Sequence, residues 1–205
     1  MIAVIDYGMG NVSSIVNMLK KLGVEAALVS NPDDLERSDK MILPGVGAFD
    51  TGMRKLKGSG LLEVIKRQAI EEAKPLLGIC LGMQMLGRKS EEGCVEGLGF
   101  IPFDNKKFSF QDEVCLKIPH MGWDIIDAAI KDDPILHGLE DQQRYYFVHS
   151  YHAVCDHNEN ILMYCDYGYT FAAAVKEKNI YGVQFHPEKS HKFGMALLDN
   201  FARRV

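Results

Sequence analysis

The sequence lacks the features that mark membrane, secreted and nucleic-acid-binding proteins. No apolar run approaches the roughly 20 residues that a membrane-spanning helix needs. The first residues, Met1 to Asp6, contain no basic segment and reach a charge at Asp6, so we expect no signal peptide. Lysine and arginine are scattered, and a formal net charge of −5 argues against a nucleic-acid binder.

Cysteine is also sparse. The five cysteines, at positions 80, 94, 115, 155 and 165, are an odd number without close pairs. This spacing indicates neither a disulfide framework nor a zinc site. The sequence contains no repeats, linkers or low-complexity stretches either. We therefore expect a reduced, cytoplasmic protein.

What remains is the composition of an ordinary globular protein, with 47% apolar and 25% charged residues. A length of 205 residues is sufficient for one α/β domain with a sizeable core and marginal for two. We therefore predict a single domain that covers residues 1–205.

The first half of the chain alternates between apolar stretches and helical periodicity. Strands are predicted at 2–5, 26–29, 40–43 and 75–80, and helices at 12–22, 51–57 and 61–73, with a short helix after the turn at 31–34. Gly23 is predicted to end the first helix. This order implies a parallel sheet with right-handed crossovers, whose ligands bind at the carboxyl ends of the strands.

The second half, from Gly93, changes character. Extended pieces are predicted at 114–118, 145–149, 153–155, 161–164, 171–175 and 180–185, with a hairpin turn at 176–179. They form either an antiparallel layer or an extension of the same sheet. A helix over 191–203 ends the chain, with Ser190 as its N-cap. The predicted fold class is α/β, with a mostly parallel central sheet flanked by helices and an additional antiparallel portion.

The stretch that carries the clearest chemical signal is Gly78-Ile-Cys80-Leu-Gly82, between the last strand of the first half and a helix-compatible run, 83–88. This is the strand–turn–helix layout of a nucleophile elbow, with sulfur in place of the usual serine hydroxyl. The two glycines make room for a tight turn, and the following helix start favours the thiolate. A buried structural cysteine is the alternative.

A base for Cys80 is predicted at His186-Pro-Glu188, directly after the apolar strand 180–185. Residues two apart in an extended chain face the same side, so Glu188 can hold the imidazole that accepts the thiol proton. Nucleophile, base and orienting carboxylate together make a catalytic triad. The alternative is a surface histidine and glutamate at the start of a loop.

Together these residues resemble the class I, or triad, glutamine amidotransferase family. Within it the likeness is to glutaminase subunits that serve a separate (β/α)8-barrel synthase. The stretches that carry it are Gly78–Gln84, Asp6-Tyr-Gly-Met-Gly-Asn11, Leu43-Pro-Gly-Val-Gly-Ala48, Ser90-Glu-Glu92, Pro119-His-Met-Gly-Trp123, Tyr146-Phe-Val-His-Ser-Tyr151 and Gly182-Val-Gln-Phe-His-Pro-Glu-Lys-Ser190. They cover nearly the whole chain in the expected order.

The resemblance implies the chemistry. Cys80 attacks the side-chain amide of glutamine, His186 takes the thiol proton and gives a proton to the leaving ammonia, and Glu188 orients His186. Water then hydrolyses the thioester to glutamate. No metal or organic cofactor is implied.

The resemblance also assigns the groups around the triad. The oxyanion donors are Leu81 N–H and a peptide of the Val46–Gly47 loop, which rests in a non-productive form in family members until the partner is liganded. The residues assigned to glutamine binding are Gly45, Gln84, Glu92, His149, Ser150 and Tyr151. Glu92 would meet the α-ammonium group. The alternatives are an ordinary polar helix residue for Gln84 and a solvated charge for Glu92.

The resemblance further implies a partner, because ammonia released into water is protonated and no longer a nucleophile. A (β/α)8-barrel synthase subunit, as a heterodimer with this chain, would join the ammonia to a nucleotide and yield imidazole glycerol phosphate and an aminoimidazole-carboxamide ribotide in histidine biosynthesis. Asn11, Trp123 and Tyr146 match positions at that interface, although Trp123 could instead be a core residue.

One position departs from the family pattern. The family usually has Asn after its Met-Gly-Trp motif, whereas this chain has Asp124. The change adds a charge near the expected interface and leaves open a paralogous partner, a relative of the barrel that makes amidino groups on surface sugars.

Other classes of protein remain as alternatives. A cysteine peptidase or γ-glutamyl hydrolase would carry a Cys–His pair but would act alone, and an ammonia donor for vitamin B6 synthesis would lack the Met-Gly-Trp stretch. A non-catalytic binding protein would have lost a triad position. A dinucleotide site at Gly8-x-Gly10 is rejected, because Ser13 stands where the third glycine belongs.

Overall fold

The computed structural model describes residues 1–111, 116–130, 132–139 and 142–205, and the structural statements that follow refer to these residues. The α-helices are α1 (Val12–Lys21), α2 (Pro32–Glu36), α3 (Phe49–Gly58), α4 (Leu62–Lys66), α5 (Leu81–Leu86) and α6 (His191–Arg203). The short helices are the π-helix η1 (Arg67–Glu71) and the 3-10 turns η2 (Pro134–Leu136), η3 (Asn158–Asn160) and η4 (Pro187–Lys189).

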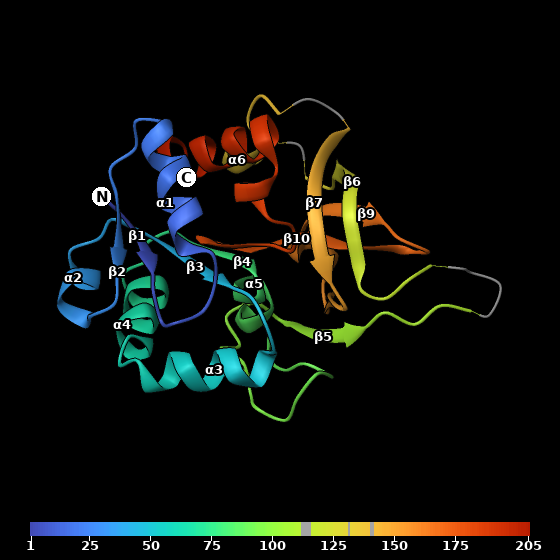
Figure 1. Cartoon of the computed structure of the whole chain (residues 1–205), viewed down its shortest axis with the longest axis horizontal. Helices are drawn as coiled ribbons and strands as arrows, with labels where there is room; N and C mark the ends of the chain where they lie inside the picture. The colour runs from blue at the N-terminus through green and yellow to red at the C-terminus, as the bar shows by residue number, and fades with distance from the viewer. Residues whose placement is uncertain (112–115, 131, 140–141) are drawn as a thin grey trace.

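The described strands belong to one sheet (Figure 1). They are β1 (Ile2–Ile5), β2 (Ala26–Val29), β3 (Lys40–Gly45), β4 (Leu76–Cys80), β5 (Phe103–Lys107), β6 (His120–Ala128), β7 (Gln143–His149), β8 (Tyr151–Cys155), β9 (Ile161–Asp166), β10 (Thr170–Glu177) and β11 (Ile180–Val183). The spatial order is β2-β1-β3-β4-β11-β10-β9-β6-β7, and β8 pairs with β10 and β5. The pairs from β2 to β11 are parallel, and those from β11 to β7 are antiparallel.

Helices cover both faces of the parallel part. In Figure 1, α1 and α6 lie on one side of the sheet and α3 and α4 on the other. Side chains alternate along each strand, so Ile2 and Val4 of β1 join the core under α1 and α6, whereas Ala3 and Ile5 join the core under α3 and α4. Burial on both faces explains why these strands are continuous apolar runs in the sequence.

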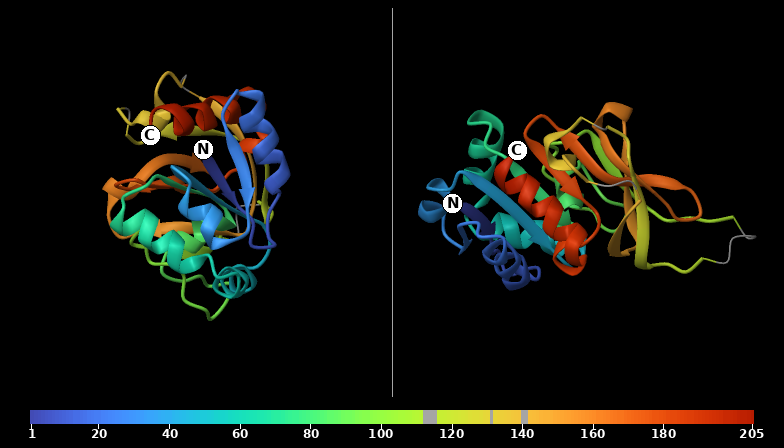
Figure 2. Two further views of the ribbon diagram at one scale, coloured as in Figure 1. Left: turned by 90° about the vertical axis from the view of Figure 1, so that its left-hand side faces the viewer. Right: turned by 90° about the horizontal axis from the view of Figure 1, so that it is seen from above.

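The antiparallel strands extend beyond the helical layers, as the view from above in Figure 2 shows. The hairpin predicted at 176–179 is present, because β10 and β11 pair antiparallel with Glu177 opposite Ile180. The second half of the chain is therefore an extension of the same sheet. The predicted helix at 191–203 is confirmed with the same bounds.

Two strands were not predicted from the sequence. The strand β6 has nine residues, of which only His120 and Ile126 are buried, and Gly122 within it has φ +147°. The strand β5 is mostly polar. The strand β5 lacks the apolar alternation by which a strand is recognised, and in β6 the alternating apolar residues Met121, Trp123 and Ile125 are all exposed. Of the extended piece predicted at 114–118, residues 114 and 115 lie outside the described residues, and 116–118 belong to no strand.

Three further predictions are corrected. The helix after the elbow begins at Leu81 rather than near residue 83, because the chain turns at a single residue, Cys80. The helix predicted at 61–73 is α4 followed by the π-helix η1. Ser190 precedes α6 but makes no side-chain cap, since its Oγ donates to His186 O at 2.6 Å and accepts from Tyr146 N at 3.0 Å.

Across the described ranges, no helix has the length and apolar character to pass through a membrane.

Candidate active site

The elbow is a one-residue turn at Cys80. Its backbone has φ +54° and ψ −110°, a conformation that is unfavourable for a residue with a side chain. A Cβ on Gly78 would lie 2.8 Å from Gly82 C, and one on Gly82 would lie 1.8 Å from Leu43 O. Both glycines are therefore required for the close packing of β4, α5 and β3 that holds the turn, as the sequence predicts.

The neighbouring strand brings a second loop to the same place. In the parallel register of β3 and β4, Gly45 lies opposite Cys80, so the loop 45–48 begins beside the sulfur. A Cβ on Gly45 would approach Tyr7 Oη to 2.7 Å, and this hydroxyl donates to Pro44 O at 2.8 Å. Gly47 has φ +100°, which glycine adopts without strain. Both groups predicted for the oxyanion, the Val46–Gly47 loop and Leu81, are beside Cys80.

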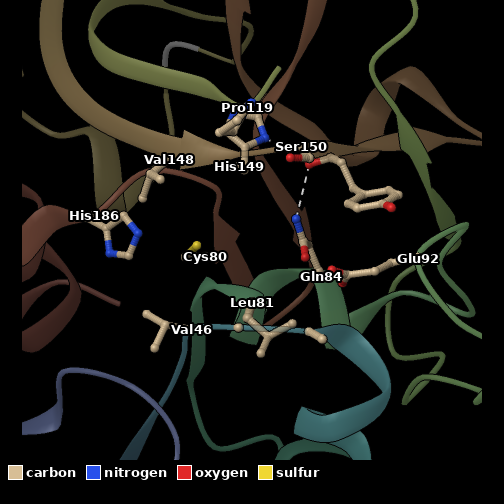
Figure 3. Close-up of a pocket in the computed structure, with 13 residues that line it drawn as sticks. Val46, Cys80, Leu81, Gln84, Glu92, Pro119, Val148, His149, Ser150 and His186 are labelled. Atoms are coloured by element: carbon tan, nitrogen blue, oxygen red, sulfur yellow. Dashed lines mark hydrogen bonds between the residues drawn. The ribbon is translucent and has the colours of Figure 1, made fainter. Parts of the chain in front are cut away.

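His186 and Glu188 form a buried pair. His186 Nδ1 donates to Glu188 Oε1 at 2.8 Å, and each side chain is 2% exposed. His186 Nε2 is buried and has no hydrogen-bond partner among the described residues. In Figure 3 the imidazole lies beside Cys80 at the edge of the cavity. The carboxylate fixes the proton on Nδ1, which leaves Nε2 for proton exchange with the sulfur or a ligand.

The charge of this pair follows from its surroundings. Burial lowers the pKa of His186, but the nearby Cys80 sulfur and the hydrogen-bonded Glu188 carboxylate outweigh burial and raise the pKa to about 10. The imidazolium is therefore the resting form of His186 at neutral pH. A thiolate beside a proton donor suits nucleophilic attack on an acyl group.

A cavity of about 440 Å³ lies in front of Cys80 (Figure 3). Ten of the predicted site residues line it, namely Val46, Gly47, Cys80, Leu81, Gln84, Glu92, His149, Ser150, Tyr151 and His186. Gly45 and Glu188 do not line it, because Gly45 lies one residue before the lining loop and Glu188 is bonded to His186 Nδ1. Sequence analysis did not assign the lining residues Ala48, Pro119 and Val148.

Gln84 and the 149–151 segment form one side of the cavity. Gln84 Nε2 donates to Tyr151 O and to Gln184 Oε1, each at 3.1 Å. His149 Nδ1 donates to Tyr151 O at 2.8 Å. Burial lowers the pKa of His149 to about 3, with only partial opposition from that carbonyl, so this imidazole is neutral at neutral pH. The site therefore has one charged and one neutral histidine.

Glu92 has a structural contact that the sequence did not predict. Its Oε2 accepts from Phe49 N at 2.8 Å, at the start of α3. The carboxylate thus caps a helix N-terminus, where negative charge is favoured, while the side chain lines the cavity. The Glu92 side chain is exposed, as the alternative interpretation expects, but this hydrogen bond fixes its carboxylate in place.

The three residues predicted for a partner interface divide into two groups. Trp123 and Tyr146 are cross-strand neighbours on β6 and β7, with ring centroids 6.1 Å apart. Trp123 also stacks on His191 at 5.4 Å, and its 38% exposure excludes a core role. Asn11 is exposed in the loop after β1, on a different part of the chain.

Two polar features beside the cavity were missed by sequence analysis. Gln184 is fully buried, and its Nε2 lies 3.8 Å from Cys80 Sγ. His120 links Asp124 to His149, with Nε2 3.2 Å from Asp124 Oδ2 and Nδ1 3.1 Å from His149 Nε2. Both belong to stretches that carried the family resemblance, Gln-Phe-His-Pro-Glu and Pro-His-Met-Gly-Trp, so the signal was present. No group of three or more His, Cys, Asp or Glu side chains in the described ranges is arranged to hold a metal ion.

Comparison with known proteins agrees with this geometry. The family model for glutamine amidotransferase class-I matches residues 3–205. The chain is 50% identical over 205 residues to imidazole glycerol phosphate synthase subunit HisH 2 of Pseudomonas aeruginosa, covering 100% of both chains, and equally so to the HisH 2 subunit of Methanococcus maripaludis.

A solved structure described as PurLQS from Thermotoga maritima matches the fold with a TM-score of 0.74, covering 98% of this chain and 96% of that one. At 19% identity, this match supports the fold alone. The predicted α/β class, with its parallel sheet and antiparallel portion, is confirmed.

Proposed function

This chain belongs to the class-I glutamine amidotransferase family, and we propose that it is the glutaminase subunit of an imidazole glycerol phosphate synthase, acting in histidine biosynthesis. One observation carries the proposal. Cys80 stands at positive φ beside the buried His186–Glu188 pair, in a chain that is 50% identical to HisH subunits along its whole length.

The reaction begins at the sulfur. The Cys80 thiolate attacks the side-chain carbonyl carbon of glutamine, and the electron pair of the C=O bond moves to oxygen. His186 is charged and gives its Nε2 proton to the leaving nitrogen, so the C–N bond breaks, ammonia departs and a thioester remains. Glu188 holds the Nδ1 proton throughout and keeps the ring in its orientation.

The negative oxygen of each tetrahedral intermediate needs donors. We assign this role to Leu81 N–H, at the start of α5, and to a peptide of the Val46–Gly47 loop. The positive φ of Gly47 gives that peptide freedom to change orientation. Water then attacks the thioester, His186 Nε2 takes its proton, and glutamate and the Cys80 thiolate are released.

The far side of the cavity suits an amino-acid substrate. The Glu92 carboxylate is fixed at the start of α3 and supplies a negative charge for the α-ammonium group. Both hydrogens of Gln84 Nε2 are engaged by Tyr151 O and Gln184 Oε1, so Oε1 of Gln84 is the atom left to accept from the substrate. Gly45 and the 149–151 segment, with His149, Ser150 and Tyr151, complete the assignment.

The ammonia needs an acceptor that is close and dry. We propose a (β/α)8-barrel synthase subunit as the partner in a heterodimer, joined through Asn11, Trp123 and Tyr146. The exposure of Trp123, and its place beside Tyr146 on β6 and β7, support an interface there. We also propose a cytoplasmic location, since the four described cysteines are free thiols, the state that a reducing compartment maintains.

The test is glutamate release from glutamine by the purified chain, alone and with the barrel subunit of a histidine pathway and its nucleotide. We expect little turnover alone, a strong rise in the complex, and none with Cys80→Ala. A matched control, Cys94→Ala, changes an exposed cysteine outside the cavity and should keep the activity. Full turnover by the isolated chain would instead identify a free-standing hydrolase.

A second outcome concerns the acceptor. If a partner is required but the histidine-pathway barrel fails, the paralogous reaction that feeds surface-sugar amidino groups replaces the proposed one. Asp124 is the position at which to look first.

A further inference from the structure

Gln184 is a buried side chain beside the elbow whose role the proposed mechanism does not use. It follows β11, which pairs in parallel with β4 up to Val183 opposite Ile79, so Gln184 comes next to Cys80. The residue is fully buried, and its backbone N–H donates to Ala173 O at 2.9 Å. Its Nε2 lies 3.8 Å from Cys80 Sγ, within hydrogen-bond range for sulfur.

The orientation of this amide is fixed by a chain of hydrogen bonds. Tyr151 O is a backbone carbonyl and can only accept, so the Gln84 amide must turn its nitrogen towards it. The second hydrogen of the same nitrogen reaches Gln184 Oε1 at 3.1 Å. With its oxygen held in this way, the Gln184 amide can present only its N–H to Cys80 Sγ.

A donor aimed at this sulfur distinguishes the two protonation states. A thiolate accepts a hydrogen bond far better than a thiol does, since bonds to ionised groups are shorter and stronger. Burial strengthens such a bond, and Cys80 is only 7% exposed. His186 provides a proton and a charge near the sulfur, whereas Gln184 provides a neutral donor that cannot give its proton away.

We propose that Gln184 is a thiolate-stabilising residue, which donates an N–H bond to the Cys80 sulfur and is held in that orientation by Gln84 and Tyr151. This inference rests on the proposed function. It adds a fourth residue to the triad, and this residue contacts the Cys80 sulfur directly. The same series of hydrogen bonds links Cys80 to the residues assigned to substrate binding, because Tyr151 O determines the orientation of both the Gln84 and the Gln184 amides.

The experiment is the pH profile of Cys80 alkylation by iodoacetamide in the full chain. The rate is followed by mass spectrometry of the Cys80 peptide, because other cysteines also react, and Cys80→Ser serves as the blank. The midpoint of the profile reports the pH at which the Cys80 thiol ionises, whereas the amplitude reports how easily iodoacetamide reaches the sulfur. A role in packing alone would change the amplitude or the stability and leave the midpoint where it was.

In Gln184→Met, of similar size but without a donor, we expect the midpoint to rise by about one pH unit. In Gln184→Glu an anion replaces the donor, and the rise should be larger. Gln184→Asn keeps the amide but shortens the side chain by one methylene, so its midpoint should also rise. This variant provides the test if the other two do not fold. The matched control is Gln68→Met, since Gln68 is also buried and donates to Leu35 O and Glu36 O in α2.

Two negative outcomes are distinguishable. A folded Gln184→Met or Gln184→Asn variant whose midpoint equals that of the wild type, or shifts no more than that of Gln68→Met, would overturn the role of Gln184 and leave the glutaminase intact. A wild-type midpoint equal to that of a free cysteine peptide would instead count against the activated thiolate on which the proposed function depends.

Discussion

His186 and His149 line the same cavity and are both almost fully buried, with 1% and 5% exposed surface. The pKa of His186 nevertheless rises to about 10, while that of His149 falls to about 3. Burial lowers the pKa of both, because it penalises the charged imidazole. The difference comes from the partners, which are Glu188 and the Cys80 sulfur for His186, and a carbonyl and a second histidine for His149.

The comparison indicates how one pocket can contain a charged histidine, His186, and a neutral histidine, His149. An ionised partner compensates for the cost of a buried charge, whereas a neutral carbonyl bonds Nδ1–H without requiring the ring to be charged. The charged histidine is therefore suited to proton transfer. The neutral one is suited to holding the 149–151 segment. Each of the following predictions changes one of the two histidines, a partner of one of them, or a residue linked to His149 through His120.

The largest effect is expected from Glu188→Gln. Without the carboxylate, the pKa of His186 falls and the tautomer is no longer fixed, so kcat for glutamate release in the activated complex should fall by about 10²- to 10⁴-fold. KM should change little, because Glu188 does not line the cavity. The matched control is Glu159→Gln, an exposed glutamate outside the cavity. A loss below tenfold would mean that the carboxylate is dispensable.

An intermediate effect is expected in the pH dependence of stability. The folded pKa of His149, about 3, lies below its ordinary value of 6.5, so the unfolded chain binds one more proton between these pH values. Stability should therefore fall as the pH drops through this window, by about 1–2 kcal/mol from pH 6.5 to 5. In His149→Gln this part of the slope should disappear, as measured by urea unfolding at fixed pH values.

The control for that slope is His157→Gln, which changes an exposed histidine. His186 has the opposite sign, because its folded pKa, about 10, lies above 6.5. The contribution of His186 to the free energy of unfolding is complete below pH 6.5 and is lost as the pH rises towards 10. His186→Gln should therefore flatten the alkaline part of the stability profile. If the free energy of unfolding fell equally with acid pH in the wild type and in His149→Gln, the pKa of His149 would not be lowered and the contrast with His186 would be wrong.

The smallest effect is expected from Asp124→Asn. The Asp124 side chain is 36% exposed, and its pairing with His120 is opposed by the burial of the ring, which lowers the pKa of His120 overall. We expect a change below about 1 kcal/mol in the free energy of unfolding and within about twofold in glutaminase activity. Asp127→Asn, at an exposed position of the same strand, is the control. A tenfold loss of activity would show that the His120–His149 link controls the site.

The sequence predicted the parallel half of the fold well because its strands are buried on both faces. The strand at 2–5, buried at every residue, and the final helix at 191–203 have the predicted bounds, and Gly23 follows α1 at φ +69°. The strand β6 was missed; its alternating apolar residues, Met121, Trp123 and Ile125, are exposed, and only His120 and Ile126 of its nine residues are buried. Pairing with β7 and β9 determines this strand, and pairing between distant segments is invisible to a local pattern.

The residues of the candidate site divide in the same way, into those that a local sequence pattern revealed and those that depend on contacts between distant segments. Cys80 and His186 were recognisable because each follows an apolar strand, and strand ends at one edge of a sheet meet in space. Gln184 was not recognised, because its importance depends on an amide orientation set by Tyr151 O, 33 positions earlier in the chain. The helix-capping bond of Glu92 to Phe49 was missed for the same reason.

The contact between Gly82 and Leu43 also has a consequence for protein engineering. Because any side chain at position 82 would overlap the Leu43 carbonyl, the elbow fits only a scaffold that supplies the adjacent strand at this spacing. Transplanting residues 76–86 alone would therefore transfer the sequence of the turn without its shape. The smallest transferable unit is β3, β4 and α5 with the loop 45–48, and it carries Cys80 together with the loop proposed to donate to the oxyanion.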